Sequence, residues 1–313
     1  MKIIKPKRLR KGDTIGIIAP ASSPDDLSKL EQSIRYFESL GYKIETGENV
    51  ASSRGYLAGK DEERLSDFHA MFKSKKISAI FCARGGYGSG RLLDKIDYRL
   101  VRNNPKIFVG YSDITQLQSA LLTKCGLLTF AGPMPVIDFG GQISTFTEER
   151  FWEMLTTNKK IGKLLQPENE KLFPIIKGDV KARLYGGNLS NIVSLIGTDY
   201  LPFIKDKILF LEETGELPYR VDRMFNHLRL AKMLSTSRAV LLGAFVDCHE
   251  HDYSKRSLTL GEVIQDYFSN SKNTVMYNLK HGHLKDNLTL PIGGLIKIHS
   301  ARGYIEITEG LLR

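Results

Sequence analysis

The chain has 313 residues, of which 42% are apolar and 26% charged, a balance typical of a globular protein long enough for two domains. Its formal net charge is +10, but the basic residues are spread along the chain without an aromatic-interleaved stripe or zinc-finger spacing, which argues against nucleic-acid binding. Three widely spaced cysteines, Cys82, Cys125 and Cys248, indicate a reducing compartment rather than a disulfide framework. The apolar run 14–20 is too short for a signal peptide or a membrane span, so we expect a cytoplasmic protein that binds no membrane.

Strands and helices are predicted to alternate over the first 140 residues. Apolar runs bounded by glycine or polar residues indicate the strands, and segments with helical periodicity come after them. The predicted strands are 14–20, 42–45, 77–83, 106–110 and 127–131, and the predicted helices are 27–40, 61–72, a segment from Arg91 onward, and 114–123. This alternation favours a parallel sheet covered by helices on both faces.

The second half has a different rhythm. After a helix start at Thr145, residues 141–180 are lysine-rich and weakly periodic, which predicts a connection between domains. Beyond it we expect a turn at 185–189, helices at 189–196, 221–233 and 260–268, and strands at 207–212, 239–246, 288–293 and 303–308. The fold class is therefore α/β: a Rossmann- or flavodoxin-like domain over 1–140 and a smaller mixed α/β domain over 181–313.

One predicted strand ends in Gly110-Tyr-Ser-Asp113, where a helix begins. A strand that breaks at glycine and turns into a helix exposes one side chain, here Ser112, beside backbone N–H groups that have no partner within the helix. A hydroxyl beside unpaired donors offers what acyl transfer needs, a nucleophile and an oxyanion site. Taken locally, however, the sequence favours a simpler role in which Ser112 or Asp113 caps the helix.

A glycine loop, Arg84-Gly-Gly-Tyr-Gly88, comes after another predicted strand of the same sheet. Ligands of open α/β sheets bind at this edge, and glycines allow backbone N–H groups to approach them closely. Neither a dinucleotide fingerprint nor a Walker lysine is present, so a glycine turn without a ligand is an equal alternative. Because both loops leave strand ends of one sheet, Gly86 could supply a second oxyanion donor facing Ser112.

Three further groups in the second half could carry chemistry. A predicted strand ends in Glu212-Glu213, of which only one can face a site, since neighbouring side chains of a strand alternate; an ion pair with a nearby arginine is the alternative. His281-Gly-His283 lies in a loop, where a histidine faces either a cleft or solvent. The segment 248–251, Cys-His-Glu-His, looks metal-like, but four neighbouring residues cannot easily wrap one tetrahedral ion, so we expect no metal site.

Taken in order, these pieces resemble the LD-carboxypeptidase family of serine peptidases, which includes muramoyltetrapeptide carboxypeptidases and microcin-C-type immunity peptidases. The resemblance covers nearly the whole chain. Its motifs lie at residues 18–22, 56–59, 83–88, 110–113, 186–189, 211–212, 218–220 and 282–283. Each motif is modest alone, and the ordered set is highly specific.

The resemblance implies a catalytic triad of Ser112 as nucleophile, His283 as general base and Glu212 as the carboxylate that orients it. It also implies an oxyanion hole made by the backbone N–H groups of Gly86 and Asp113. No cofactor and no metal are implied, and the expected assembly is a homodimer. The motif Gly-x-Ser-x-Gly of α/β-hydrolases is absent, so the nucleophile turn is of another kind.

By the same resemblance, His281 and Glu213 are bystanders. Arg84 and Tyr87 are candidates for substrate binding by position only. The implied reaction is hydrolysis of an L,D-amide bond, which releases the terminal D-alanine of a muropeptide tetrapeptide during peptidoglycan recycling. One alternative is a microcin-C-type immunity peptidase that cleaves an aminoacyl-adenylate analogue. Another is a non-catalytic α/β protein that binds a small ligand.

Overall fold

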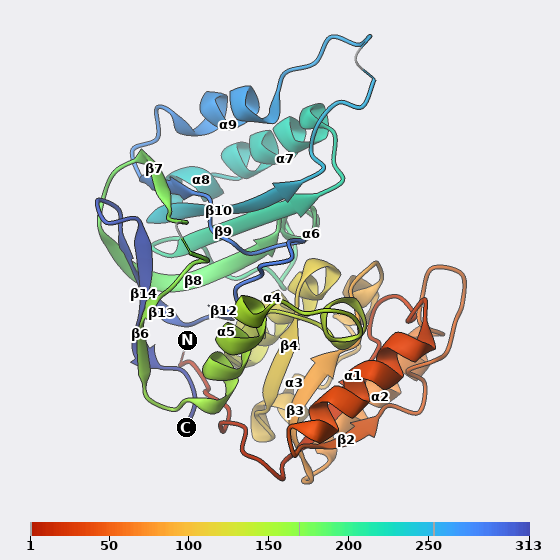
Figure 1. Ribbon diagram of the computed structural model, residues 1–313. Helices are drawn as coiled ribbons and strands as arrows, with labels where there is room; N and C mark the ends of the chain where they lie inside the picture. Colours follow the sequence, from red (N-terminus) through yellow and green to blue (C-terminus); the bar gives the residue numbers. More distant parts are fainter. Residues whose placement is uncertain (1, 169, 253) are drawn as a thin grey trace.

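The computed structural model describes residues 2–168, 170–252 and 254–313, and it folds around two sheets, one built mainly by each half of the chain (Figure 1). The first half contributes β1 (Thr14–Ile18), α1 (Leu27–Ser39), β2 (Lys43–Thr46), α2 (Asp61–Lys73), β3 (Ile77–Cys82), α3 (Tyr98–Asn103), β4 (Ile107–Gly110), α4 (Thr115–Cys125), β5 (Thr129–Ala131) and α5 (Thr145–Thr156). The second contributes β6 (Lys160–Leu164), β7 (Phe173–Ile176), β8 (Val180–Asn188), α6 (Leu189–Ser194), β9 (Ile208–Thr214), α7 (Pro218–Leu230), α8 (Met233–Thr236), β10 (Ala239–Val246), α9 (Leu260–Phe268), β11 (Thr274–Tyr277), β12 (Leu290–Ile292), β13 (Leu295–His299) and β14 (Tyr304–Gly310).

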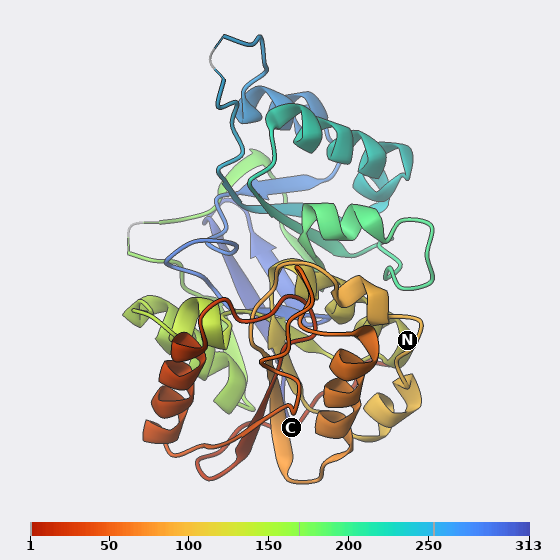
Figure 2. The same cartoon turned by 90° about the vertical axis from the view of Figure 1, so that its right-hand side faces the viewer.

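The first sheet has the strand order β12-β5-β4-β3-β1-β2, and its five strands from the first half are all parallel. Alternate side chains of these strands point to opposite faces, as strand geometry requires. Phe81 and Val109 belong to the apolar core under α1 and α5, whereas Ile80 and Phe108 belong to the core under α2 and α4. Figure 2 shows helices on both faces. The parallel, doubly covered sheet predicted from the sequence is confirmed.

The second sheet has the order β6-β14-β13-β8-β9-β10-β11-β7. Its central strands β8 to β11 are parallel, and the strands outside them are antiparallel, so the predicted mixed α/β half is also confirmed. Among the residues described, no helix is both long enough and apolar enough to span a bilayer.

The two halves are more interleaved than the sequence predicted. The segment 141–180, expected to be a connection, carries α5 and the strands β6 and β7 of the second sheet, while β12 from the second half extends the first sheet by pairing with β5. The chain ends also meet, because Lys5 forms an ion pair with Glu309 with 2.8 Å between Nζ and Oε2. Domain boundaries near 140 and 181 therefore stay a prediction.

Two local predictions differ from the structure. The helix expected from Arg91 is a short 3-10 turn at Ser89–Leu92, and the next α-helix is α3. The segment 185–189, expected to be a turn, is instead the end of β8. Its two glycines are typical of turns, and they led to the wrong prediction. Gly186 must be glycine, because a Cβ there would lie 1.9 Å from the carbonyl oxygen of Phe210 on β9.

Arg64 on α2 is buried completely and fixes the loops at the carboxyl edge of the first sheet. Its guanidinium donates hydrogen bonds to the carbonyl oxygens of Pro20, just after β1, and of Gly88, at the end of the glycine loop. It also forms an ion pair with Asp61, with 2.6 Å between Nη2 and Oδ1. A hydrogen bond from Arg91 to the same carboxylate contributes most to holding the pKa of Asp61 below its usual range.

Replacement of Arg64 by alanine should therefore destabilise the fold strongly. The substitution leaves two buried carbonyl oxygens and a buried carboxylate without their shared donor, and we expect the free energy of unfolding to fall by about 3–5 kcal/mol. Urea denaturation measures the change. The matched control is Arg35→Ala, since Arg35 is exposed on α1 and makes only a loose ion pair with Glu31 at 3.6 Å. Equal effects of the two substitutions would contradict the structural role of Arg64.

Candidate active site

Ser112 lies where β4 turns into α4, and its backbone is strained. Its φ is 62°, in the left-handed region that disfavours residues with a Cβ, and such strain is concentrated at functional sites. A residue that caps a helix has extended backbone instead. Among the described residues the Ser112 hydroxyl makes no hydrogen bond to a helix N–H, so the capping role that local sequence favoured is not what the structure shows.

The glycine loop passes directly against this turn. A Cβ built on Gly85 would lie 3.0 Å from the Ser112 Cβ and 3.2 Å from its Oγ, so a side chain at residue 85 would press on the serine. The next residue, Gly86, has φ 102°, and within the described part of the chain its N–H donates no hydrogen bond. Ser22 supports the loop by accepting a hydrogen bond from the Tyr87 N–H at 3.1 Å. The loop thus places a free backbone donor near the serine.

Asp113 joins the glycine loop to the serine turn. Its buried carboxylate accepts hydrogen bonds from the N–H groups of Gly88 at 3.3 Å and Ser89 at 2.8 Å. In return, the Ser89 hydroxyl donates to the Asp113 carbonyl oxygen at 2.7 Å. Burial raises the pKa of Asp113, against which the hydrogen bonds from Ser89 act. The side chain of Asp113 is therefore a brace, while its backbone belongs to the same turn as Ser112.

Arg84 and Tyr87, the two residues of the glycine loop predicted to bind substrate, differ in their surroundings. Arg84 is committed to neighbours, since its guanidinium pairs with Asp25 and donates to the carbonyl oxygen of Ser23. Tyr87 is 53% exposed and packs edge to face on the exposed Tyr56, with 5.5 Å between ring centroids. Both rings are exposed to solvent beside the loop, so each offers an apolar face for contact with a ligand.

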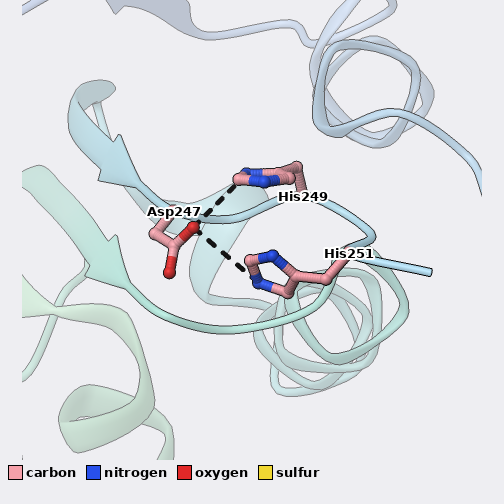
Figure 3. Close-up of side chains that lie close together, drawn as sticks. All are labelled: Asp247, His249 and His251. Carbon is pink, nitrogen blue, oxygen red and sulfur yellow. Dashed lines mark ion pairs between the residues drawn. The ribbon is translucent and has the colours of Figure 1, made fainter. Parts of the chain in front are cut away.

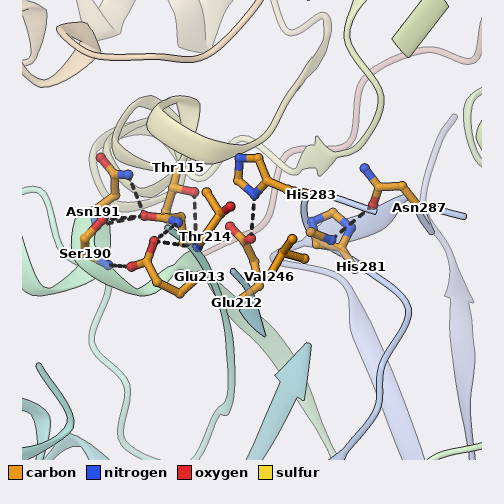
Figure 4. Close-up of polar contacts among 12 residues, drawn as sticks. Thr115, Ser190, Asn191, Glu212, Glu213, Thr214, Val246, His281, His283 and Asn287 are labelled. Atoms are coloured by element: carbon orange, nitrogen blue, oxygen red, sulfur yellow. Dashed lines mark hydrogen bonds and ion pairs between the residues drawn. The ribbon is translucent and has the colours of Figure 1, made fainter. Parts of the chain in front are cut away.

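Glu212 and His283 meet on the side of the site that the second half supplies (Figure 4). Glu212 is the fifth residue of β9 and is buried, and its Oε2 lies 3.1 Å from Nδ1 of His283 in the loop after β11. Two glycines make this contact possible. A Cβ on Gly282 would lie 2.8 Å from Glu212 Oε2, and one on Gly243 would lie 2.8 Å from the carbonyl oxygen of His281.

The surroundings of His283 favour its protonated form. Burial alone would lower its pKa, but the hydrogen bond and charge of Glu212, together with the charges of Glu213 and Asp138, outweigh burial and raise it. A histidine whose Nδ1 is held by a buried carboxylate keeps its Nε2 available to exchange a proton with a neighbour.

Tyr111 brings the two sides of the site together. It precedes Ser112 in the chain, and its buried ring lies 5.1 Å from the imidazole of His283, centroid to centroid. Asp138, on the π-helical turn Pro135–Phe139, lines the same cavity as Tyr111 and His283. Its carboxylate accepts a hydrogen bond from the Met134 N–H at 2.7 Å. Burial raises the pKa of Asp138 to about 6, although the hydrogen bond from Met134 and the charge of His283 act against it.

Glu213 points away from His283, as strand alternation predicted, and it organises the junction between the two halves (Figure 4). Its buried carboxylate accepts hydrogen bonds from Asn188 Nδ2 and from the Ser190 N–H, both at 2.8 Å. The N–H of Asn188 in turn donates to Thr115 Oγ1, at the start of α4, at 3.1 Å. Glu213 thereby ties the strand that carries Glu212 to the helix that begins just after Ser112.

His281 is also not part of the pair. It is 1% exposed, and its Nδ1 hydrogen-bonds the carbonyl oxygen of Leu288, which closes the loop that carries His283. Burial lowers its pKa, so it is held neutral. Its role is structural.

At the metal-like segment, the side chains that lie close together are not the four of residues 248–251 (Figure 3). Cys248 is buried, with its Sγ 3.5 Å from the Val246 carbonyl oxygen, and takes no part. Instead Asp247 joins His249 and His251 on the surface, where one ligand atom from each lies within 4.8 Å of the others. The prediction of no metal site considered residues 248–251 alone and overlooked Asp247.

Several residues of the site carried no readable signal in the sequence. Asp138 lies in a π-helical turn that no periodicity predicts, and Arg64 lies in the middle of an amphipathic helix. Asn188 stands in the motif 186–189, which predicted a turn and gave no sign of the contact between Asn188 and Glu213. Strand ends could have pointed to Asn188, since β8 and β9 are parallel neighbours.

Comparison with known proteins places both halves of the chain in one family. The family model described as the LD-carboxypeptidase N-terminal domain matches residues 15–132, and that of the LD-carboxypeptidase C-terminal domain matches residues 181–298. The "Probable murein peptide carboxypeptidase" of Bacillus subtilis (strain 168) is 37% identical over 309 residues, which cover 98% of this chain and 95% of that protein.

Solved structures agree with this assignment. The muramoyltetrapeptide carboxypeptidase from Oxalobacter formigenes superposes with a TM-score of 0.81 at 31% identity, covering 93% of this chain and 97% of that one. The microcin C7 self-immunity protein MccF in complex with aspartyl sulfamoyl adenosine superposes with a TM-score of 0.91 at 28% identity, covering 99% and 100%. The chain therefore belongs to the LD-carboxypeptidase family of serine-type peptidases, as its ordered motifs predicted.

Proposed function

We propose that this LD-carboxypeptidase releases the terminal D-alanine from muropeptide tetrapeptides by hydrolysing the L,D-amide bond, with Ser112, His283 and Glu212 as its triad. The observation that carries the proposal is the pairing of His283 with the buried Glu212 beside the strained turn of Ser112. The identity with a murein peptide carboxypeptidase supports the substrate class. A cytoplasmic homodimer that recycles imported muropeptides belongs to the same proposal.

In the acylation step, the Ser112 Oγ attacks the amide carbonyl carbon while His283 Nε2 takes its proton. The carbonyl oxygen becomes an oxyanion, which accepts hydrogen bonds from the N–H groups of Gly86 and Asp113. Loss of one such donor typically lowers kcat by about 10²–10³-fold. His283 then gives the proton to the amide nitrogen, the C–N bond breaks, and D-alanine leaves.

In the deacylation step, His283 takes a proton from a water molecule that attacks the acyl-enzyme ester. The ester C–O bond breaks, the proton passes to Ser112 Oγ, and the tripeptide leaves with a new carboxylate. In both steps the imidazole is transiently charged. The carboxylate of Glu212, held 3.1 Å from Nδ1, stabilises that charge and fixes the tautomer that leaves Nε2 free.

A second candidate substrate is an aminoacyl-adenylate analogue of the kind that microcin immunity peptidases cleave. Two observations favour it: the close superposition on MccF bound to aspartyl sulfamoyl adenosine, and the exposed pair of Tyr56 and Tyr87, on which a base could stack. The greater identity with a murein peptide carboxypeptidase over almost the whole chain ranks it second.

Replacement of the nucleophile tests the proposal directly. Wild-type protein incubated with a purified murein tetrapeptide should release one D-alanine, seen by mass spectrometry as the tripeptide. Ser112→Ala and His283→Ala should lower kcat by at least ~10³-fold, since members of a triad act as a unit. The matched control is Ser194→Ala, because Ser194 is exposed on α6 and its hydroxyl, within the described part of the chain, hydrogen-bonds only the Asn191 carbonyl oxygen.

Two outcomes would contradict the proposal. If wild-type protein leaves the tetrapeptide intact but cleaves aspartyl sulfamoyl adenosine, the second substrate replaces the first while the triad stands. If Ser112→Ala cleaves either substrate as fast as wild type does, Ser112 is not the nucleophile.

The pH dependence of kcat/KM should report His283. Because the general base must be neutral and its pKa is raised, activity should fall on the acid side below a pKa that lies above the ordinary value for histidine. Asp138→Asn removes a negative charge that favours the protonated imidazole, so the pKa should fall and the acid limb should move to lower pH.

Rates measured from about pH 5 to about pH 9 would show this shift. Asp266→Asn makes the same change of charge on the exposed face of α9 and should leave the profile unmoved. An unmoved profile in Asp138→Asn, or one that moves to higher pH, would show that Asp138 does not act on His283.

A further inference from the structure

Building on the proposed function, we propose that the cavity beside His283 is the subsite for the amino acid that leaves, and that Lys285 binds its carboxylate. A carboxypeptidase must distinguish a free terminal carboxylate from an internal amide, and the triad itself contains no group that does so. Three features of the cavity carry the assignment: its place beside His283, the charges that line it, and the lack of an ion-pair partner for Lys285 among the described residues.

The cavity has a volume of about 290 Å³ and opens to solvent. Its walls come from the start of the serine turn, the π-helical turn with the loop after it, and the loop that carries His283. The lining residues are Tyr111, Ile137, Asp138, Gly141, Gln142, Ile143, His283, Leu284 and Lys285. The space admits a small amino acid together with water.

The place of the cavity relative to His283 assigns it to the leaving side. A general acid must reach the atom that it protonates, at about 2.6–3.2 Å, so the residue that owns the leaving nitrogen lies against His283. The glycine loop, which carries the proposed oxyanion donor Gly86, passes Ser112 at Gly85 and does not line the cavity. We therefore assign the leaving portion of the substrate to the cavity and the acyl portion to the space outside it.

Lys285 is the positively charged residue of the cavity that is available to bind a ligand. Its side chain is exposed, and no carboxylate of the described residues forms an ion pair with it. Arg84, the cation expected from the sequence, is already paired with Asp25. The backbone of Lys285 is nevertheless fixed, because Thr147 Oγ1 donates to its carbonyl oxygen at 3.0 Å. An ammonium group without an ion-pair partner, on a backbone that is held in place, is suited to bind and release a carboxylate.

The charges of the cavity match the released molecule. Asp138 is half-buried and lines the cavity, and its carboxylate accepts a hydrogen bond from the Met134 N–H and lies beside the Tyr111 hydroxyl. The leaving nitrogen takes one proton from His283 and departs as an amine, which takes a second proton from water, so the free amino acid carries an ammonium and a carboxylate. Its ammonium would lie at the His283 and Asp138 end, and its carboxylate at the Lys285 end.

The test compares two substrates that differ only at the terminus: a murein tetrapeptide with a free carboxylate, and the same peptide as a primary amide. Wild-type protein should cleave the acid with a kcat/KM about 10- to 100-fold above that for the amide, mainly through KM. Lys285→Ala should lose this preference by losing activity toward the acid alone. Lys285→Arg should keep it. Lys297→Ala, which removes a lysine from a different surface cavity, should match wild type.

The outcomes separate this inference from the proposed function. If wild type cleaves neither peptide, the proposed function fails. If wild type cleaves acid and amide equally, or if Lys285→Ala keeps the preference, the function stands and the subsite is wrong. An equal loss toward both peptides in Lys285→Ala would mean that the lysine acts on the fold or on His283, and that also overturns the assignment.

A second observation, independent of the active site, concerns the surface cluster in Figure 3, where we infer a site for one Zn²⁺ or a similar divalent transition metal. Asp247 Oδ1 lies 3.5 Å from His249 Nδ1 and 3.7 Å from His251 Nε2. Ligand atoms bound at about 2.0–2.1 Å with a tetrahedral angle are about 3.3–3.4 Å apart, so the two spacings to Asp247 need to contract by only a few tenths of an ångström. The ligand atoms of the two histidines lie within 4.8 Å of each other, and rotation of these exposed side chains can bring them closer.

The sequence explains why these three side chains meet. They follow β10 in a turn where Asp247 has a left-handed backbone, φ 54°, and where Cys248 between them turns into the core. All three are exposed, so a fourth ligand would be water, and imidazole with carboxylate is a donor set that suits zinc. The cluster contains neither Glu212 nor His283, so the ion would have no part in the proposed hydrolysis.

Calorimetric titration of the dialysed full chain with Zn²⁺ tests the site. We expect one saturable site per chain, with affinity reduced at least ~10-fold in His249→Ala and in His251→Ala, and unchanged in the control His227→Ala, an exposed histidine on α7. No saturable binding, or binding that survives both substitutions, would overturn the inference.

Discussion

The site depends on a buried carboxylate that has a single hydrogen-bond partner among the described residues. Glu212 is 1% exposed, one of its oxygens is hydrogen-bonded to His283, and the other has no partner among the described residues. A buried charge without a partner destabilises a fold by several kcal/mol, so the fold must keep His283 in place. The glycines at 243 and 282, and the buried His281, are the local means by which the loop reaches that carboxylate.

The same constraint extends to the first half of the chain through a short polar network. Glu213 holds Asn188, whose N–H donates to Thr115, and Asn191 on α6 accepts a hydrogen bond from Gln116 at 2.6 Å. These contacts join the strand that carries Glu212 to the first turn of α4, immediately after Ser112. Because all of them are buried or half-buried, the position of the serine turn relative to His283 is set by several short hydrogen bonds rather than by one contact.

Features that depend on local periodicity and strand alternation were predictable from the sequence. The parallel sheet of the first half, the strand ends that carry the glycine loop and Ser112, and the opposite directions of Glu212 and Glu213 all belong to this class. Features that depend on distant pairing were not predictable: β12 crosses back to the first sheet, and β6 and β7 join the second. In the site, Asp138 and Arg64 were not predicted. Asp138 lies in a π-helical turn and Arg64 is a buried charge in an amphipathic helix, and neither follows the periodic patterns from which elements and burial are predicted.

In the proposed triad the two halves supply different parts, which explains why Ser112 would need both. Its turn and the free N–H of Gly86 come from the first sheet, which Asp113 and Arg64 brace without any contribution from the second. That part alone would have a strained hydroxyl and the proposed oxyanion donors but not the proposed base, and a serine hydroxyl without a base is a weak nucleophile at neutral pH. His283 arrives only with the second sheet, and its imidazole packs on Tyr111, the residue before the serine. Any change that loosens the junction at Thr115 and Asn188 should therefore separate base from nucleophile while leaving both local structures intact.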